Sequence, residues 1–298
     1  MNTSTEQTLA TIEAMRRQEH NEYFVTDYLY ELPRIAATNS IDNHIDASCR
    51  VVMANWCTEV ANYGNYKSDT VAIAMNCLDR FLTTFSGQEV LLDRHLYQLA
   101  VMTSLYSSAK IHEQEIMDTH LVSTLSKGVH TPAAIEVMES KMLMAIQWRV
   151  NPPTAMSFMR LISDLVLDTS LEFRQIILDR TQQQIEMTVG DYKFCTYNAS
   201  SIAFASMLNS IKSTFEDDTL YNNVNITVGN ILAVNESIND LRQLMYQHME
   251  DNDINIGMIQ SHVTKKRLSY YTDVNNGKEN SKKLSPRTVR ISVANTVN

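Results

Sequence analysis

Apolar residues along most of this chain recur at steps of three and four, the period of an amphipathic helix. In the stretch CRVVMANWCTEV, residues 49–60, this spacing puts Cys49, Met53, Trp56 and Val60 on one stripe. The 298 residues include only seven Gly and five Pro, which are too few turn-forming residues for the many turns of a β-protein. We therefore predict an all-α fold.

The helical period divides the chain into a leading helix and two successive sets of helices. The leading helix is expected over Thr5–Leu32, before Pro33. The first set is expected in the ranges 47–63, 68–85, 94–115, 113–122 and 132–148. The second set is expected in the ranges 154–167, 171–189, 199–213, 217–222 and 235–249.

Two sets of five helices joined at Pro152-Pro153 suggest a structural duplication. We predict four parts: an N-terminal helical segment (1–46), a first helical domain (47–151), a second (152–255) and a tail (256–298). The tail is polar and rich in Asn and Ser, so we expect it to be disordered.

Charge is distributed unevenly between the body and the tail. From Val263 onward, eight basic and two acidic side chains give +6, whereas the preceding 262 residues carry −15. An acidic body is a poor candidate for binding nucleic acid over its surface.

Several classes of function find no support in the sequence. The longest apolar runs, Val71–Met75 and Met142–Ile146, are five residues long, so we expect no membrane partner. The N-terminus lacks the apolar segment of a secretory signal, which predicts an intracellular protein. The four Cys form no CxxC pair, and the eight His are scattered. We found no catalytic motif, and we expect no metal, no cofactor and no enzymatic residue.

Five segments in register resemble the cyclin box. The stretch 49–60 is similar to the first-helix pattern MRxxLxDWLxEV, and LDRFL at 78–82 matches the second helix. LYQLAVMTSLYSSAKIHE resembles the third helix, which brings Gln98 and Lys110 into register. The segment from His130 to Thr154 is similar to the fifth helix and its exit, and YNASSIAFAS resembles a pattern in the second box.

Some positions depart from the family pattern. Asn55 stands where the first motif has Asp, Cys49 where it has Met, and Tyr97 where a Leu usually precedes Gln98. The chain is thus identified as a divergent member of the cyclin family.

The resemblance implies two tandem five-helix cyclin boxes preceded by an N-terminal helix. It also implies a non-catalytic regulatory subunit that binds and activates a cyclin-dependent serine/threonine kinase in cell-cycle control. In cyclins, a Lys of the third helix and a Glu of the fifth form the polar part of the kinase-binding surface, and these are Lys110 and Glu139 here. Apolar neighbours expected beside them are Ile111, Met142, Tyr23, Phe24 and Tyr28.

The family implies two further groups of residues. In several cyclins, outward residues of the first helix and a Gln of the third form a patch that docks RxL-containing substrates or inhibitors. Carried over, the patch comprises Cys49, Val52, Met53, Trp56, Glu59 and Gln98. Arg50, Asp79 and Arg80 are expected to make paired, structural contacts, because charges within buried helices are usually paired.

Short motifs in the tail suggest regulation. Lys278, Glu279 and Asn280 spell KEN, which resembles the degron read by the anaphase-promoting ubiquitin ligase. Ser285 precedes a Pro and is a candidate phosphosite, whose phosphate would reduce the tail's positive charge. The basic clusters are candidate nuclear localisation signals, so we expect the protein in nucleus and cytoplasm.

Three alternatives stay open at this stage. A nutrient- or signal-responsive cyclin would act outside the division cycle. A transcription-factor-B-like protein uses the same repeated fold to bind DNA, but its two helical domains would be expected to carry a basic surface, whereas the body of this chain is acidic. An unrelated helical scaffold would not explain LDRFL together with the register of Lys110 and Glu139.

Overall fold

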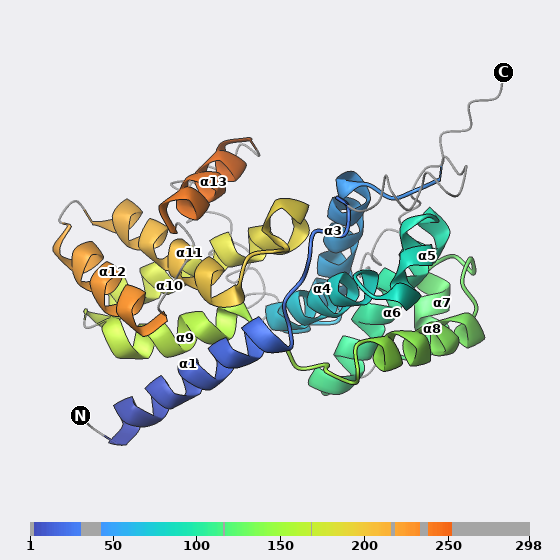
Figure 1. The fold of residues 1–298 in the computed structure, drawn as a ribbon, viewed down its shortest axis with the longest axis horizontal. Helices are drawn as coiled ribbons and strands as arrows, with labels where there is room; N and C mark the ends of the chain where they lie inside the picture. The colour runs from blue at the N-terminus through green and yellow to red at the C-terminus, as the bar shows by residue number, and fades with distance from the viewer. Residues whose placement is uncertain are drawn as a thin grey trace, which may run out of the picture.

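The computed structural model describes residues 3–30, 43–115, 117–167, 169–215, 218–232 and 238–251. Within these ranges the regular structure is helical throughout and contains no strand, so the all-α prediction is confirmed. The helices form two groups side by side, and the first helix runs beneath the second group (Figure 1). None of the described helices combines the length and apolarity needed to cross a bilayer.

The first unit is built around one central helix, α6, which is buried almost continuously from Tyr97 to Ala109. Ala100, Ser104 and Ala109 are small, which lets the surrounding helices approach closely. The elements of this unit are α3 (Ala47–Tyr63), α4 (Ser68–Leu82), η1 (Phe85–Gly87), α5 (Gln88–Leu91), α6 (Arg94–His112), α7 (Thr119–Leu125) and α8 (Pro132–Ala145).

The second unit repeats this plan around α11, which is buried from Ser200 to Ile211. Its core is a separate apolar cluster from that of the first unit. The elements are α9 (Ala155–Val166), α10 (Leu171–Gly190), η2 (Tyr192–Phe194), α11 (Ala199–Thr214), α12 (Thr219–Leu232) and α13 (Ile238–Asp251).

Local signals explain most helix starts, but α4 begins with help from a distant residue. Thr131 caps α8 by accepting a hydrogen bond from the Ala134 amide, and Pro132 occupies the first turn. At α4, neither Ser68 nor Asp69 is the N-cap, because the helix begins after Lys67, which makes no side-chain cap. Instead, Glu113 accepts a hydrogen bond from the Lys67 amide at 2.9 Å and one from the Thr70 hydroxyl.

The turn after α4 depends on a glycine. A Cβ at Gly87 would lie 2.0 Å from the carbonyl oxygen of Phe81. Any larger residue would therefore push η1 and α5 away from the end of α4.

The leading helix α1 spans Thr3–Asn21, so the expected continuation to Leu32 is wrong. From Glu22 to Tyr30 the chain leaves the helix, because its side chains bind both units. Tyr28 donates to Asp79 of α4 at 2.8 Å. The Tyr192 hydroxyl donates to Asp27 at 2.6 Å and accepts from the Leu29 amide at 2.9 Å. These long-range bonds replace the hydrogen bonds that a continued helix would make.

Helix α1 packs against the second unit, where Ile12 is fully buried in the apolar cluster. The second unit also differs from expectation at α12. The segment expected at 217–222 extends as a full helix to Leu232, because Val224, Val228 and Leu232 bury one face of it.

A buried ion pair joins the two units. Arg50 of α3 contacts Asp79 through two hydrogen bonds, of 3.1 Å from Nε and 2.8 Å from Nη2. Its Nη1 donates to the carbonyl oxygens of Val189 and Gly190, at 2.7 and 2.8 Å. These are the last carbonyls of α10, where the helix dipole favours a cation. Burial opposes the charge, but Asp79 outweighs burial and holds the pKa of Arg50 well above its usual value.

A second charged contact joins α1 to the start of α11. Asn198, the N-cap of α11, makes no side-chain cap bond. Glu19 of α1 caps α11 instead: its carboxylate accepts hydrogen bonds from the Ser200 amide at 3.0 Å and from the Ser200 hydroxyl at 2.5 Å. Glu19 is only 3% exposed. Burial raises the pKa of its carboxyl, and the Ser200 hydrogen bonds offset only part of this effect.

We expect Arg50→Met to lower the free energy of unfolding by about 3 to 5 kcal/mol, because it leaves the buried Asp79 without its cation. Denaturant unfolding of the full chain measures this. The double variant Arg50→Met, Asp79→Asn should lose less than the sum of the two single variants, since no charge stays unpaired. A loss below about 1 kcal/mol for Arg50→Met would contradict this role of the pair.

We expect Glu19→Gln to change how stability depends on pH. A carboxyl whose pKa is raised in the folded state loses stability as pH rises from its ordinary value of 4.5 through the raised value. Gln has no such loss, so the stability of the variant relative to the unaltered chain should increase over that interval and then level off. Denaturant unfolding at pH steps measures the difference, and a constant difference would disprove the effect.

Candidate functional site

Lys110 and Glu139 meet at the surface of the first unit, where α6 and α8 pack together. The Lys110 ammonium lies 3.3 and 3.2 Å from the two carboxylate oxygens of Glu139. The Ser107 hydroxyl donates to the same carboxylate at 3.0 Å. The Lys110 side chain is 46% exposed and the Glu139 side chain 13%. The pair thus offers a positive group to solvent and holds its acid behind it.

The electrostatics of Lys110 follow from this position. Burial would lower its pKa, but the hydrogen bond and charge of Glu139 outweigh burial, and the net shift is upward. The ammonium also lies 5.2 Å from the centroid of the Tyr106 ring, within cation–π range. Lys110 is therefore a fixed cation.

The end of α6 that carries Lys110 is anchored on both sides. His112 contacts the carbonyl oxygen of Val150 through Nε2 at 3.2 Å. The next residue, Glu113, caps α4 as described above. A partner would therefore meet the last turn of α6 in a fixed orientation, at a small entropic cost.

Apolar side chains surround the Lys110–Glu139 pair. Ile111 is 47% exposed, whereas Met142 is buried. Both line a small pocket between α6 and α8, to which α6 also contributes Ser104, Ser107 and Ser108 and α4 contributes Cys77. The structure thus brings Lys110, Glu139 and Ile111 to one surface. Met142 is buried beneath this surface and lines the same pocket as Ile111, so its contact with a kinase stays a prediction.

The exposed apolar residues of α8 and its exit were not predicted from the sequence as part of a surface. Val137, Met144 and Trp148 are 69%, 65% and 67% exposed. Gln147 and Trp148 both adopt positive φ, of 56° and 58°, which non-glycine residues rarely do. A signal was present in the sequence, because this segment is apolar on more than one face.

The aromatic residues expected to adjoin this surface divide into two groups. Phe24 is exposed, and Tyr23 is partly buried with its ring 4.7 Å from the Arg80 guanidinium carbon. Tyr28 is buried at the junction with Asp79 and packs edge-on against Tyr192. The prediction that Tyr28 lies on a surface is therefore wrong.

The predicted substrate-docking patch is mostly not a surface. Cys49, Met53 and Trp56 belong to the apolar core of the first unit, as their shared helical stripe requires. Gln98 is buried and its side-chain oxygen lies 3.1 Å from Nε2 of His130. The prediction is wrong for these four residues. Val52 and Glu59, the other two members, are exposed.

Arg80 makes structural contacts at the base of the N-terminal segment. Its guanidinium donates to the carbonyl oxygens of Arg149 and, at 3.4 Å, of Glu22. Burial lowers its pKa. Arg80 thus ties the exit of α8 to the segment that follows α1.

Other expectations concern metals and the tail. Among the described residues, no three His, Cys, Asp or Glu side chains are grouped so as to hold a metal ion. Lys278, Glu279, Asn280 and Ser285 lie outside the described residues.

Comparisons with known proteins identify the family. Residues 11–151 match the model of the cyclin N-terminal domain, and residues 153–272 match that of the cyclin C-terminal domain. The chain is 27% identical over 206 residues to cyclin-D3-2 of Arabidopsis thaliana, an alignment covering 67% of this chain and 54% of that protein. It is 23% identical over 245 residues to the G2/mitotic-specific cyclin-B1 of Xenopus laevis, covering 82% of this chain and 55% of that protein. The chain thus spans about half the length of these relatives.

Solved structures share the fold. A viral cyclin from herpesvirus saimiri aligns with a TM-score of 0.56 at 12% identity, over 74% of this chain and 96% of that chain. A chain of the CAK complex of Chaetomium thermophilum bound to ATP-γ-S aligns with a TM-score of 0.51 at 11% identity, over 95% and 94%. This chain belongs to the cyclin family.

We expect the charge swap Lys110→Glu, Glu139→Lys to change the free energy of unfolding by less than about 1 kcal/mol, because the pair is partly exposed and the swap preserves it. Lys110→Glu alone should cost more than the swap, since it sets two acids side by side. A double-mutant cycle by denaturant unfolding separates these values. Equal stability of the single variant and the swap would show that the two groups do not interact.

Proposed function

We propose that this cyclin-family chain is a regulatory subunit that binds and activates a cyclin-dependent serine/threonine kinase, in control of the cell-division cycle. The observation that carries the proposal is the Lys110–Glu139 pair with Ile111 beside it, held where the helices corresponding to the third and fifth of the cyclin box meet. The family uses these two positions as the polar part of its kinase-binding surface.

The surface has the composition that a protein interface requires. A fixed cation and its acid determine the orientation in which a partner binds, because a partner bound in another orientation would leave these charges unpaired. The apolar energy comes from Ile111, which is exposed beside the pair, and from the pocket that Ile111 lines together with Met142. Met144 and Trp148 are further exposed apolar residues of α8 and its exit. Phe24, the exposed aromatic residue predicted for this surface, lies on the N-terminal segment, and its contact with a kinase stays a prediction.

The proposed mechanism is a population shift in the kinase. Phosphoryl transfer requires the kinase's own Lys–Glu ion pair and its metal-binding Asp to be in place. A rigid helical surface that binds only that arrangement stabilises it by the difference in affinity between the two states. The cyclin then contributes no catalytic group of its own.

Partners and regulation beyond the kinase are part of the proposal. We retain recruitment of RxL-containing substrates as a prediction only for the surface around Val52 and Glu59, since the other predicted patch residues are buried. Degradation through the KEN sequence and partial nuclear localisation rest on the tail's sequence alone. The relatives' names include both G1/S-specific and G2/mitotic-specific cyclins, so they favour no single phase.

The test is affinity purification of the full-length protein from its own cells, followed by detection of bound kinase and of phosphorylation activity. The swap Lys110→Glu, Glu139→Lys preserves an ion pair but reverses its polarity toward a partner. A matched control is the swap Lys212→Glu, Asp218→Lys, which reverses an exposed pair in the second unit.

We expect the unaltered chain and the control swap to recover an active kinase, and the Lys110–Glu139 swap to lose at least tenfold. Recovery of equal kinase by both swaps would remove this surface from the interface. If the folded, unaltered chain recovers no kinase, the activator function is wrong, and DNA or scaffold binding becomes the better explanation.

A further inference from the structure

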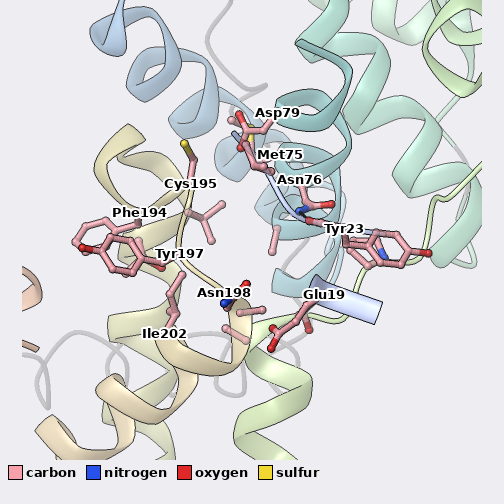
Figure 2. A pocket seen from close by; sticks show the side chains of 18 of the residues that line it. Glu19, Tyr23, Met75, Asn76, Asp79, Phe194, Cys195, Tyr197, Asn198 and Ile202 are labelled. Carbon is pink, nitrogen blue, oxygen red and sulfur yellow. Dashed lines mark hydrogen bonds between the residues drawn. The ribbon is translucent and has the colours of Figure 1, made fainter. Parts of the chain in front are cut away.

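A cavity lies where the N-terminal segment and both units meet. It lies on the other face of α4 from Cys77, which lines the small pocket beside Ile111 and Met142. It has a volume of about 120 Å³. Met75 and Asn76 of α4 lie on one side and Cys195 and Tyr197 on the other, with Glu19 and Asn198 at the lower edge (Figure 2). The exposed ring of Phe24 belongs to its wall, which gives access from solvent.

Among the charged groups of the wall, Glu19 has no Lys or Arg in an ion pair with it in the part of the chain that the structure describes. Arg50 and Asp79 both line the cavity, but they neutralise each other in their bidentate pair. Glu19 also lines it and is 3% exposed. Within the described residues, the ion pairs of Glu19 include no Lys or Arg: His20 lies at 3.8 Å, and Arg16, one turn earlier on the same helix, acts on Glu19 by its charge without forming an ion pair.

Glu19 has hydrogen-bonding capacity to spare. A carboxylate offers about four acceptor sites. The hydrogen bonds that it accepts from the Ser200 amide and hydroxyl leave room for a further donor. Asn76 offers a second acceptor, because its Oδ1 is buried and finds no hydrogen-bond partner among the described residues. Its amide nitrogen is engaged with the carbonyl oxygen of Tyr23 at 3.3 Å.

The rest of the wall suits an apolar body. Phe24, Met75, Ile185, Val189 and Ile202 contribute aliphatic and aromatic surface. An engineered cavity of about 150 Å³ with such a lining takes up benzene. At about 120 Å³, this cavity has the size for a single small ring or a short alkyl chain.

We propose that the cavity binds a small organic cation, a primary ammonium on a ring or a short alkyl chain, with Glu19 as its counter-ion. A buried carboxylate without a cation is costly, and an ammonium supplies both the missing charge and up to three donors. The apolar body fills the remaining volume. This site is independent of the Lys110 surface and of the proposed kinase.

The test uses benzylamine, which is charged at neutral pH, on the full chain, with binding measured by calorimetry and ligand-observed NMR. Benzyl alcohol keeps the ring without the charge, and benzoate reverses the charge. We expect benzylamine to bind at least tenfold more tightly than benzyl alcohol, and benzoate not to bind. Equal binding of benzylamine and benzoate, or no binding of benzylamine, would overturn the proposal.

Two variants locate the site. Glu19→Gln should weaken benzylamine binding at least tenfold, because it removes the charge and keeps the shape. Ala72→Phe should also weaken it, because Ala72 lines the cavity and a ring there fills it. The matched control is Glu13→Gln, an exposed acid on the same helix, which should leave binding unchanged. An equal loss with Glu13→Gln, or none with Glu19→Gln, would show that benzylamine binds elsewhere.

An ammonium can reach the cavity on a free amine or on a lysine side chain of a peptide. Nα-acetyl-lysine amide represents the second source and is measured beside benzylamine and butylamine. Tighter binding of the free amines, sensitive to Glu19→Gln, assigns a small-molecule site. Tighter binding of the lysine derivative with the same sensitivity assigns a peptide site.

Discussion

The buried ion pair between Arg50 and Asp79 is the interaction on which the arrangement of the whole chain depends. One guanidinium holds α4 through Asp79 and the end of α10 through two carbonyls. Asp79 in turn receives Tyr28 from the N-terminal segment. Because a buried charge that loses its partners costs several kcal/mol, all of these groups must stay within hydrogen-bonding distance of one another. The pair therefore fixes how the two units and the N-terminal segment sit together.

The same physical device recurs at other contacts. Glu113 meets the start of α4, and Glu19 meets the start of α11, whereas Arg50 meets the end of α10. In each case the side-chain charge is opposite in sign to the partial charge at that end of the helix, which is favourable. The side chain also binds backbone groups that the helix itself leaves unpaired. Each unit has its own apolar core, so these directional polar contacts supply much of the orientation between elements.

Local patterns predicted much of this fold, and long-range contacts account for the errors. The cap at Thr131-Pro132 can be read from neighbouring residues. The end of α1 cannot, because the segment after Asn21 is held by Asp79 and Tyr192, which lie far away in the sequence. Likewise, nothing near Lys67 shows that Glu113 caps its helix.

The candidate site could be predicted in its polar part and less well in its apolar part. The family register assigned Lys110 and Glu139 to one surface, and in the structure the two side chains form an ion pair across α6 and α8. The helical stripe of Cys49, Met53 and Trp56 correctly indicated a core face, and the family's docking patch was carried onto it in conflict with that period. At these residues the role assigned from the family pattern and the helical period of apolar residues disagree, and the observed burial follows the period. Exposing such a stripe would remove apolar side chains from the core.

Helix α4 connects the junction to the proposed kinase surface. Asp79 lies at the junction, whereas Cys77 lines the pocket beneath Ile111. Between the two surfaces, Arg80 bonds the carbonyl oxygen of Arg149, just before Val150 of the same pocket. A partner on the Lys110 surface would thus bind side chains of α6 and α8 that pack over α4. Helix α4 is already held by the charged contacts of Asp79 and Arg80. Little binding energy is then spent on ordering the cyclin, and more of it is available to stabilise one state of the partner.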